Sequence, residues 1–150
     1  VENSENIASL DPSYSLYKTI AAIRSVKWVG DKINAKTSLF FWTNPNAPTG
    51  EFAESAVIEK FAAKFPGVVV IDEAYADFAR DNCMKLAAAK NNSNIIVMRT
   101  LSKSYSLAGL RLGYCVGPEN LIEALYKIKD SYNVDTIAQL LALEAIKDQQ

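Results

Sequence analysis

Five short apolar runs alternate along this chain with stretches of helical periodicity, which leaves few architectures open. The runs are rich in β-branched and aromatic residues and predict buried strands at 26–29, 38–43, 67–72, 95–99 and 112–116. Apolar residues at helical spacing predict helices at 16–24, 53–65, 82–90, 121–130 and 136–147. Strands that alternate with helices predict an α/β domain with a mostly parallel sheet and helices on both faces.

Polar side chains follow several of the predicted strands at the point where each strand ends. Asn44 and Asp72 come at the ends of two of these runs, and the segment 100–103 follows a third. Ligands of such sheets gather beyond the carboxyl ends of the strands. We therefore expect these three blocks to lie on one rim of the domain.

The apolar residues of the last two predicted helices are interpreted as packing faces. They recur at helical spacing and are Leu121, Ile122, Leu125, Ile128, Ile137, Leu140, Leu141 and Leu143. Cys115 lies in an apolar run and is expected to be an inert core residue.

Composition excludes several classes of function. The 150 residues are 49% hydrophobic and carry a formal net charge of −1, with no basic run of the kind that binds nucleic acid. The chain has no histidine, which excludes Ser-His-Asp and Cys-His catalysis and histidine-ligated metal sites. Proton transfer must therefore fall to lysine, tyrosine or an acidic residue, and no metal site is predicted.

The cysteine count and the hydropathy pattern bear on the compartment. Two cysteines cannot build a disulfide framework, and they fit reduced thiols in a cytoplasmic protein. No apolar stretch approaches the roughly 20 residues that a membrane helix needs. The first six residues are acidic and polar, which is not typical of a signal peptide.

The segment 94–113 offers groups for a cofactor that carries both an aldehyde and a phosphate. The amine of Lys103 can form an imine if part of it is neutral, and we expect Arg111 and partial desolvation to lower its pKa. The hydroxyls of Thr100 and Ser102, together with the Arg111 guanidinium, suit a phosphate dianion. A solvent-exposed lysine without a function is the simpler alternative for Lys103 alone.

Asp72 follows four aliphatic residues, and a carboxylate in such a place is costly unless a cation pairs with it. A protonated pyridine nitrogen is one such cation. A hydrophobic strand followed by Asp-Glu is also typical of the Walker B element of P-loop ATPases. The phosphate loop Gly-x-x-x-x-Gly-Lys-Ser/Thr that such an ATPase needs does not occur in this sequence.

Three motifs in this order resemble the fold-type I pyridoxal-phosphate aminotransferases, most closely the histidinol-phosphate aminotransferase group. They are Asn-Pro-Asn-Ala-Pro-Thr-Gly at 44–50, Asp-Glu-Ala-Tyr-x-x-Phe at 72–78, and Thr-Leu-Ser-Lys-x-x-x-Leu-Ala-Gly-Leu-Arg-x-Gly-Tyr at 100–114. The resemblance runs from about residue 11 to about residue 148. It implies the aspartate aminotransferase-like fold, with residues 1–150 as a partial cofactor-binding large domain and the small C-terminal domain absent.

The resemblance also implies an activity and its partners. It implies exchange of an amino group between histidinol phosphate, or a similar amine, and 2-oxoglutarate in histidine biosynthesis. The enzyme would be a cytoplasmic homodimer with pyridoxal 5'-phosphate as cofactor. A pyridoxal-phosphate-dependent decarboxylase of the same fold, or a non-catalytic cofactor-binding fragment, are the alternatives that stay open.

The same resemblance assigns roles to individual residues. It makes Lys103 the catalytic lysine that binds the cofactor covalently and moves a proton. Tyr14 would stack on the pyridine ring, Asp72 would pair with the ring nitrogen, and Tyr75 would donate to the phenolic oxygen. The phosphate contacts would be Thr100, Ser102 and Arg111. Relatives commonly have asparagine at the position of Ala47, so that contact is expected to be lost or to shift to Asn46 or Asn44.

Overall fold

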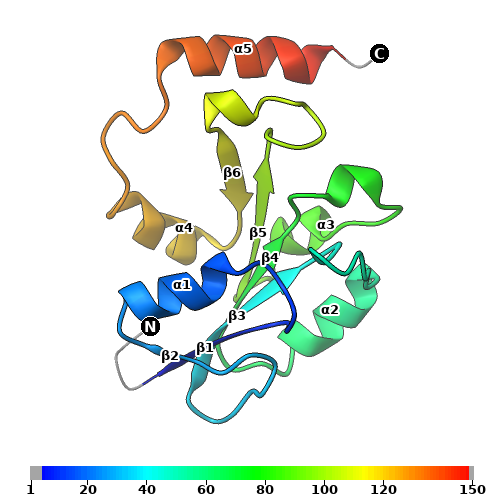
Figure 1. Ribbon diagram of the computed structural model, residues 1–150, viewed down its shortest axis with the longest axis vertical. Helices are drawn as coiled ribbons and strands as arrows, with labels where there is room; N and C mark the ends of the chain where they lie inside the picture. Colours follow the sequence, from blue (N-terminus) through cyan, green and yellow to red (C-terminus); the bar gives the residue numbers. More distant parts are fainter. Residues whose placement is uncertain (1–4, 149–150) are drawn as a thin grey trace.

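The fold is built on one six-stranded sheet in which five strands are parallel. A computed structural model describes residues 5–148 of the chain. The strands lie in the order β2-β1-β3-β4-β5-β6 (Figure 1). Their bounds are β1 Asn6–Ser9, β2 Lys27–Trp28, β3 Thr37–Thr43, β4 Val68–Asp72, β5 Ile95–Thr100 and β6 Gly113–Val116. Only β6 runs antiparallel, at the edge beside β5.

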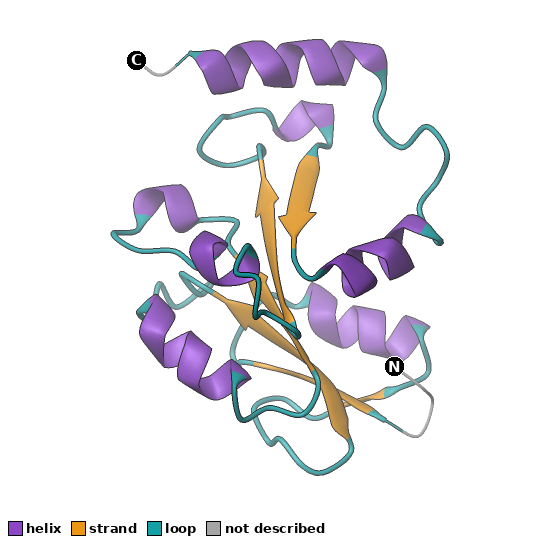
Figure 2. Cartoon of the chain, turned by 180° about the vertical axis from the view of Figure 1, so that it is seen from behind, coloured by secondary structure: helices purple, strands orange, loops and turns teal. Residues whose placement is uncertain are grey.

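Helices cover both faces of the sheet (Figure 2). The helices are α1 Leu16–Ile23, α2 Ser55–Ala62, α3 Met84–Ala87, α4 Glu119–Tyr126 and α5 Thr136–Lys147, with 3-10 turns η1 Ala76–Phe78 and η2 Ala108–Leu110. On one face α2 and α3 pack on the strands, and on the other face α1 and α4 do so. Helix α5 lies beyond the carboxyl end of β5 (Figures 1 and 2).

The core is two clusters, one on each face of the sheet, because successive strand residues point to opposite faces. In β4, Val69 and Ile71 pack with Ile58 of α2, whereas Val70 packs with Tyr17 of α1 on the other face. Both faces of the central strands are therefore buried. This explains why the parallel strands have nearly continuous apolar sequences.

Glycine allows a close approach at the start of β4. A Cβ atom built on Gly67 would lie 2.1 Å from the carbonyl oxygen of Ser38 on the neighbouring chain segment. No side chain fits there, since real Cβ contacts never come so close. Gly67 therefore lets the chain pass close to β3 just before β4 begins, and the far ends of both strands carry the candidate site.

The predicted fold class is confirmed, and most strands are within one or two residues of the prediction. One strand was missed: β1, Asn6–Ser9, lies between β2 and β3 in the sheet. Its four residues, Asn-Ile-Ala-Ser, give too short an apolar pattern to be recognised. The helices expected at 53–65 and 82–90 are shorter in the structure, because α2 and α3 span only Ser55–Ala62 and Met84–Ala87.

The prediction of packing faces for the last two helices is wrong for most of its residues. Leu121 packs on the core, but Leu125, Ile128, Ile137, Leu140, Leu141 and Leu143 are exposed. Cys115, which was expected in the core, is exposed as well, because β6 is an edge strand. None of the helices in residues 5–148 is both long and apolar enough to cross a bilayer.

Candidate functional site

The carboxyl ends of three central strands bring polar groups into one row. The strand register places Thr43 of β3 opposite Asp72 of β4, and Asp72 opposite Met98 of β5. The segment that carries Lys103 follows β5, which ends at Thr100. The rim expected from strand order is therefore present in the structure.

A pocket of about 470 Å³, here called the rim pocket, opens at this edge of the sheet. It is lined by Tyr14, Thr43, Ala47, Asp72, Ala74, Tyr75, Met98, Arg99, Thr100, Ser102, Lys103, Ala108 and Arg111. Seven of the eight predicted cofactor contacts are in this lining, and Asn46 is the exception. The pocket thus combines one carboxylate, one amine, two guanidinium groups and several hydroxyls.

The carboxylate of Asp72 is held on both of its oxygens. The hydroxyl of Tyr17 donates to Oδ2 at 2.6 Å, and the backbone N–H of Ala74 donates to Oδ1 at 3.0 Å. Hydrogen bonds from two directions fix the plane of the carboxylate. Asp72 is therefore oriented before any ligand binds.

Tyr17 is a site residue that the sequence did not reveal. It lies in the helix predicted at 16–24, and its ring is buried and stacked on Phe41, with centroids 4.4 Å apart. Its hydroxyl contacts Thr43 at 2.9 Å as well as Asp72. Burial raises the pKa of the Tyr17 phenol far above its ordinary value, and the charge of Asp72 raises it further.

The expected lowering of the Lys103 pKa is not found. Hydrogen bonding with the Tyr75 side chain instead raises the pKa of Lys103 above its ordinary value. The Lys103 ammonium lies 5.1 Å from the centroid of the Tyr75 ring. The lysine is exposed, so there is little desolvation to oppose this effect, and Arg111 is turned to a different partner.

The groups expected to hold a phosphate lie around the turn that follows β5. The hydroxyl of Thr100 is 2.9 Å from that of Ser102. Arg111 adopts a left-handed backbone conformation with φ of 52°, and its Nη1 donates to the carbonyl of Ala108 at 2.8 Å. Such a conformation costs a non-glycine residue of the order of 1 kcal/mol, and strain of this kind clusters at functional sites.

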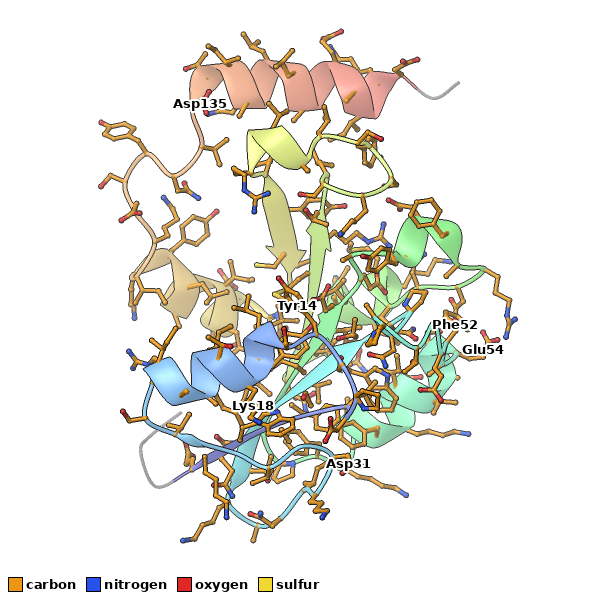
Figure 3. The ribbon with its side chains drawn as sticks, viewed as in Figure 1. Tyr14, Lys18, Asp31, Phe52, Glu54 and Asp135 are labelled. Carbon is orange, nitrogen blue, oxygen red and sulfur yellow. The ribbon has the colours of Figure 1, made fainter. Side chains whose placement is uncertain are left out.

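Two further predicted contacts, Tyr14 and Asn46, lie at different depths. Tyr14 precedes α1 and is half exposed (Figure 3). Its ring and the Tyr17 ring are in a T-shaped arrangement, with ring centroids 5.7 Å apart. Asn46 is buried, and its amide is fully used: it accepts from Ser13 and donates to Pro12 and Thr49. Asn46 therefore holds the loop that carries Tyr14 and does not line the rim pocket.

A buried ion pair ties the Lys103 loop to β4. Arg99 donates twice to one oxygen of Glu73, at 2.8 and 2.9 Å, and the backbone N–H of Cys83 donates to the other oxygen. Arg99 also lies 3.6 Å from Asp77, which accepts a hydrogen bond from Ser104, the residue after Lys103. The strand end and the loop are thereby fixed relative to each other.

Comparison with known proteins places the chain in a family. The model of the family described as aminotransferase class I and II matches residues 1–150, which is the whole chain. The chain belongs to this family. A histidinol-phosphate aminotransferase of Syntrophotalea carbinolica is 43% identical over 97% of this chain and 45% of its own length. Histidinol-phosphate aminotransferase 1 of Nostoc sp. is also 43% identical, over 92% of this chain and 42% of its own length.

Solved structures of the aminotransferase family show the same fold. Histidinol-phosphate aminotransferase from Sinorhizobium meliloti, in complex with pyridoxal-5'-phosphate, matches 99% of this chain with a TM-score of 0.89 at 25% identity. An aminotransferase from Staphylococcus aureus matches 99% of the chain with a TM-score of 0.86 at 28% identity. The chain covers 45% and 46% of these two structures, so it spans less than half the length of its relatives.

Proposed function

We propose that this chain is the cofactor-binding part of a pyridoxal-phosphate-dependent aminotransferase. The proposed reaction exchanges an amino group between histidinol phosphate, or a similar phosphorylated amine, and 2-oxoglutarate. The observation that carries the proposal is the lining of the rim pocket, where Asp72 at the end of β4 meets Lys103 and Arg111 from the segment after β5. The 43% identity to two histidinol-phosphate aminotransferases supports this choice of amine.

The donor set of the rim pocket fits the chemistry of pyridoxal phosphate. When bound, this cofactor supplies an aldehyde that can take up an amino group and a pyridinium ring that withdraws electrons. The carboxylate of Asp72 matches the ring-nitrogen cation, and two hydrogen bonds already orient it. Lys103 offers the only amine in the lining and is proposed as the covalent attachment point.

The remaining parts of the proposed cofactor have partners in the same pocket. A phosphate dianion suits the hydroxyls of Thr100 and Ser102 and the fork of Arg111. The aromatic ring of Tyr14 suits one face of the pyridine, and the phenol of Tyr75 suits the oxygen next to the aldehyde. Asn46 is left out of this set, since its amide is used within the loop.

The two alternative functions, a decarboxylase and a fragment that only binds the cofactor, have less support than transamination. The likeness to L-threonine-O-3-phosphate decarboxylase from Porphyromonas gingivalis has a TM-score of 0.83 but only 20% identity, which supports the shared fold and no reaction. The 43% identity to two histidinol-phosphate aminotransferases supports transamination over a fragment that only binds the cofactor. We therefore place transamination first.

The context of the reaction is part of the proposal. We take residues 1–150 as part of a large cofactor-binding domain, with the substrate-holding groups supplied by other segments, in a homodimer. We place the enzyme in the cytoplasm. Two free cysteines, Cys83 and Cys115, are consistent with a reducing compartment.

Covalent trapping tests the role of the lysine. The protein that carries this sequence is incubated with pyridoxal phosphate, reduced with borohydride and digested, and the modified peptide is found by mass spectrometry. We expect the label on Lys103, and Lys103→Ala abolishes it. Lys90→Ala, a change of an exposed lysine outside the pocket, leaves the labelling unchanged. Unchanged labelling in Lys103→Ala contradicts the assignment.

A second measurement separates the enzyme from a binding fragment. The loaded protein is mixed with histidinol phosphate, and the absorbance spectrum reports whether the cofactor is converted to its amine form. Conversion followed by its reversal with 2-oxoglutarate is expected of the aminotransferase. Trapping at Lys103 without conversion favours the binding-only alternative, and release of carbon dioxide from an amino acid favours the decarboxylase.

A further inference from the structure

A short chain of hydroxyls runs beneath the rim pocket from Asp72 to Asn46. The hydroxyl of Tyr17 contacts Asp72 at 2.6 Å and Thr43 at 2.9 Å. The hydroxyl of Thr43 is 3.0 Å from that of Ser13, which donates to Asn46 at 2.8 Å. Every link joins residues that are far apart in the sequence.

The number of hydroxyl hydrogens determines the donor and the acceptor in each of these hydrogen bonds. A phenol has a single hydrogen, and because a carboxylate can only accept, the Tyr17 hydrogen goes to Asp72. The Ser13 hydrogen goes likewise to the carbonyl oxygen of Asn46. Thr43 is left as the donor to one of the two hydroxyls. Asp72 is thus permanently an acceptor.

Tyr17 cannot give up this hydrogen under ordinary conditions. Burial and the neighbouring Asp72 both raise the pKa of the phenol, so the hydroxyl stays protonated across the range in which proteins are folded. The ring is 3% exposed and stacked on Phe41, with an interplanar angle of 7°. The hydroxyl is therefore fixed in position as well as in protonation state.

We propose that Tyr17 is a positioning residue for cofactor binding, which acts through Asp72 by holding its carboxylate aimed at the cation of the cofactor ring. This inference rests on the proposed function, because it takes the ring nitrogen as the partner of Asp72. Tyr17 itself does not line the rim pocket and acts only through the carboxylate.

The test compares two cofactors that differ at one ring atom. Dissociation constants are measured for pyridoxal phosphate and for its 1-deaza analogue, in which carbon replaces the ring nitrogen. Tyr17→Phe keeps the ring on Phe41 and removes the hydroxyl that binds Asp72. We expect pyridoxal phosphate to bind about tenfold more weakly, or about 1.4 kcal/mol, which is typical of a lost hydrogen bond to a charged group.

The 1-deaza analogue separates positioning from a general effect on the fold. It carries no ring cation for Asp72, so Tyr17→Phe leaves its dissociation constant within about twofold. Tyr132→Phe, at a residue that is 97% exposed, leaves both constants unchanged and serves as the matched control. Equal weakening of both cofactors, or no weakening of pyridoxal phosphate, overturns the inference.

A second variant covers the case in which Tyr17→Phe does not fold. Thr43→Val removes the hydroxyl next to Tyr17 but keeps the shape of the side chain. We expect it to weaken the binding of pyridoxal phosphate selectively, by less than Tyr17→Phe does. A loss that is equal for both cofactors again overturns the inference. Failure of the unmodified protein to attach pyridoxal phosphate at Lys103 contradicts the proposed function instead, so the two failures are distinct.

Discussion

Replacing Arg99 by methionine tests how much the buried ion pair between Arg99 and Glu73 contributes to the free energy of unfolding. The change keeps an unbranched side chain in place of the aliphatic stem of Arg99 and removes both hydrogen bonds to Glu73, whose side chain is fully buried. A buried charge left without its partner costs about 3–5 kcal/mol. Glu73 keeps one donor, the backbone N–H of Cys83. We therefore expect a loss near the lower limit, about 3 kcal/mol.

The pairing of Arg99 is strong enough to outweigh its own desolvation. Burial alone would lower the pKa of this guanidinium, but the hydrogen bond and the charge of Glu73 raise it overall. A folded domain is stable by about 5–15 kcal/mol, so a loss of about 3 kcal/mol is a large share. In urea, with a slope of about 2 kcal/mol per molar, the unfolding midpoint falls by roughly 1.5 M.

The chain supplies a matched control for this experiment. Arg80 pairs with Glu54, which is labelled in Figure 3 at the start of α2, but the two side chains are 75% and 46% exposed. Exposed pairs contribute about 0–1 kcal/mol, so Arg80→Met is nearly neutral. Unfolding is followed by tryptophan fluorescence and circular dichroism. If Arg99→Met and Arg80→Met destabilise the protein equally, the argument from burial is refuted.

A double variant identifies the source of the loss. In Glu73→Gln/Arg99→Met the amide still accepts from the backbone N–H of Cys83, but no charge is left buried. We expect the double variant to recover part of the stability that Arg99→Met loses. A double variant that is as unstable as the sum of both single changes shows that packing, and not the charge, is decisive.

Two remaining predictions concern the reactivity of side chains. Burial raises the pKa of Cys83 to about 12, while Cys115 is exposed, so a thiol reagent near neutral pH should label Cys115 first and Cys83 only after unfolding. Fast labelling of both thiols in the folded protein contradicts the buried position of Cys83. Tyr75 raises the pKa of Lys103, so Tyr75→Phe lowers it, increases the neutral amine at a given pH and speeds acylation of Lys103 by an amine reagent. An unchanged pH profile of acylation would show that the phenol does not affect the amine.

Several parts of the candidate site could be read from the sequence because they depend on local order. Asp72 directly follows a buried strand, and Lys103 and Arg111 flank one short turn after another strand. In a parallel sheet such positions fall on the same rim whatever the strand order. The alternation of strands and helices could also be predicted from the sequence, because it depends on hydrophobic periodicity alone.

Other parts depend on which side chain fills the space next to another, and no local pattern carries that information. The hydroxyl of Tyr17 reaches Asp72, a residue 55 positions away, whereas the sequence indicated only that Tyr17 lies in a helix. Asn46 was expected to contact the cofactor, but Ser13 and Pro12 take up its amide. The pKa of Lys103 was expected to fall and instead rises, because the lysine faces a phenol in an exposed position.

The sequence by itself determined the order of strands and helices and the reactive groups at the strand ends, since both follow from hydrophobic period and chain position. Only the tertiary structure decided that the short segment Asn6–Ser9 is an inner strand, and that the large apolar residues of α5 lie exposed. Burial is a property of contacts between distant segments, and a short or amphipathic stretch has the same local pattern whether or not a partner covers it.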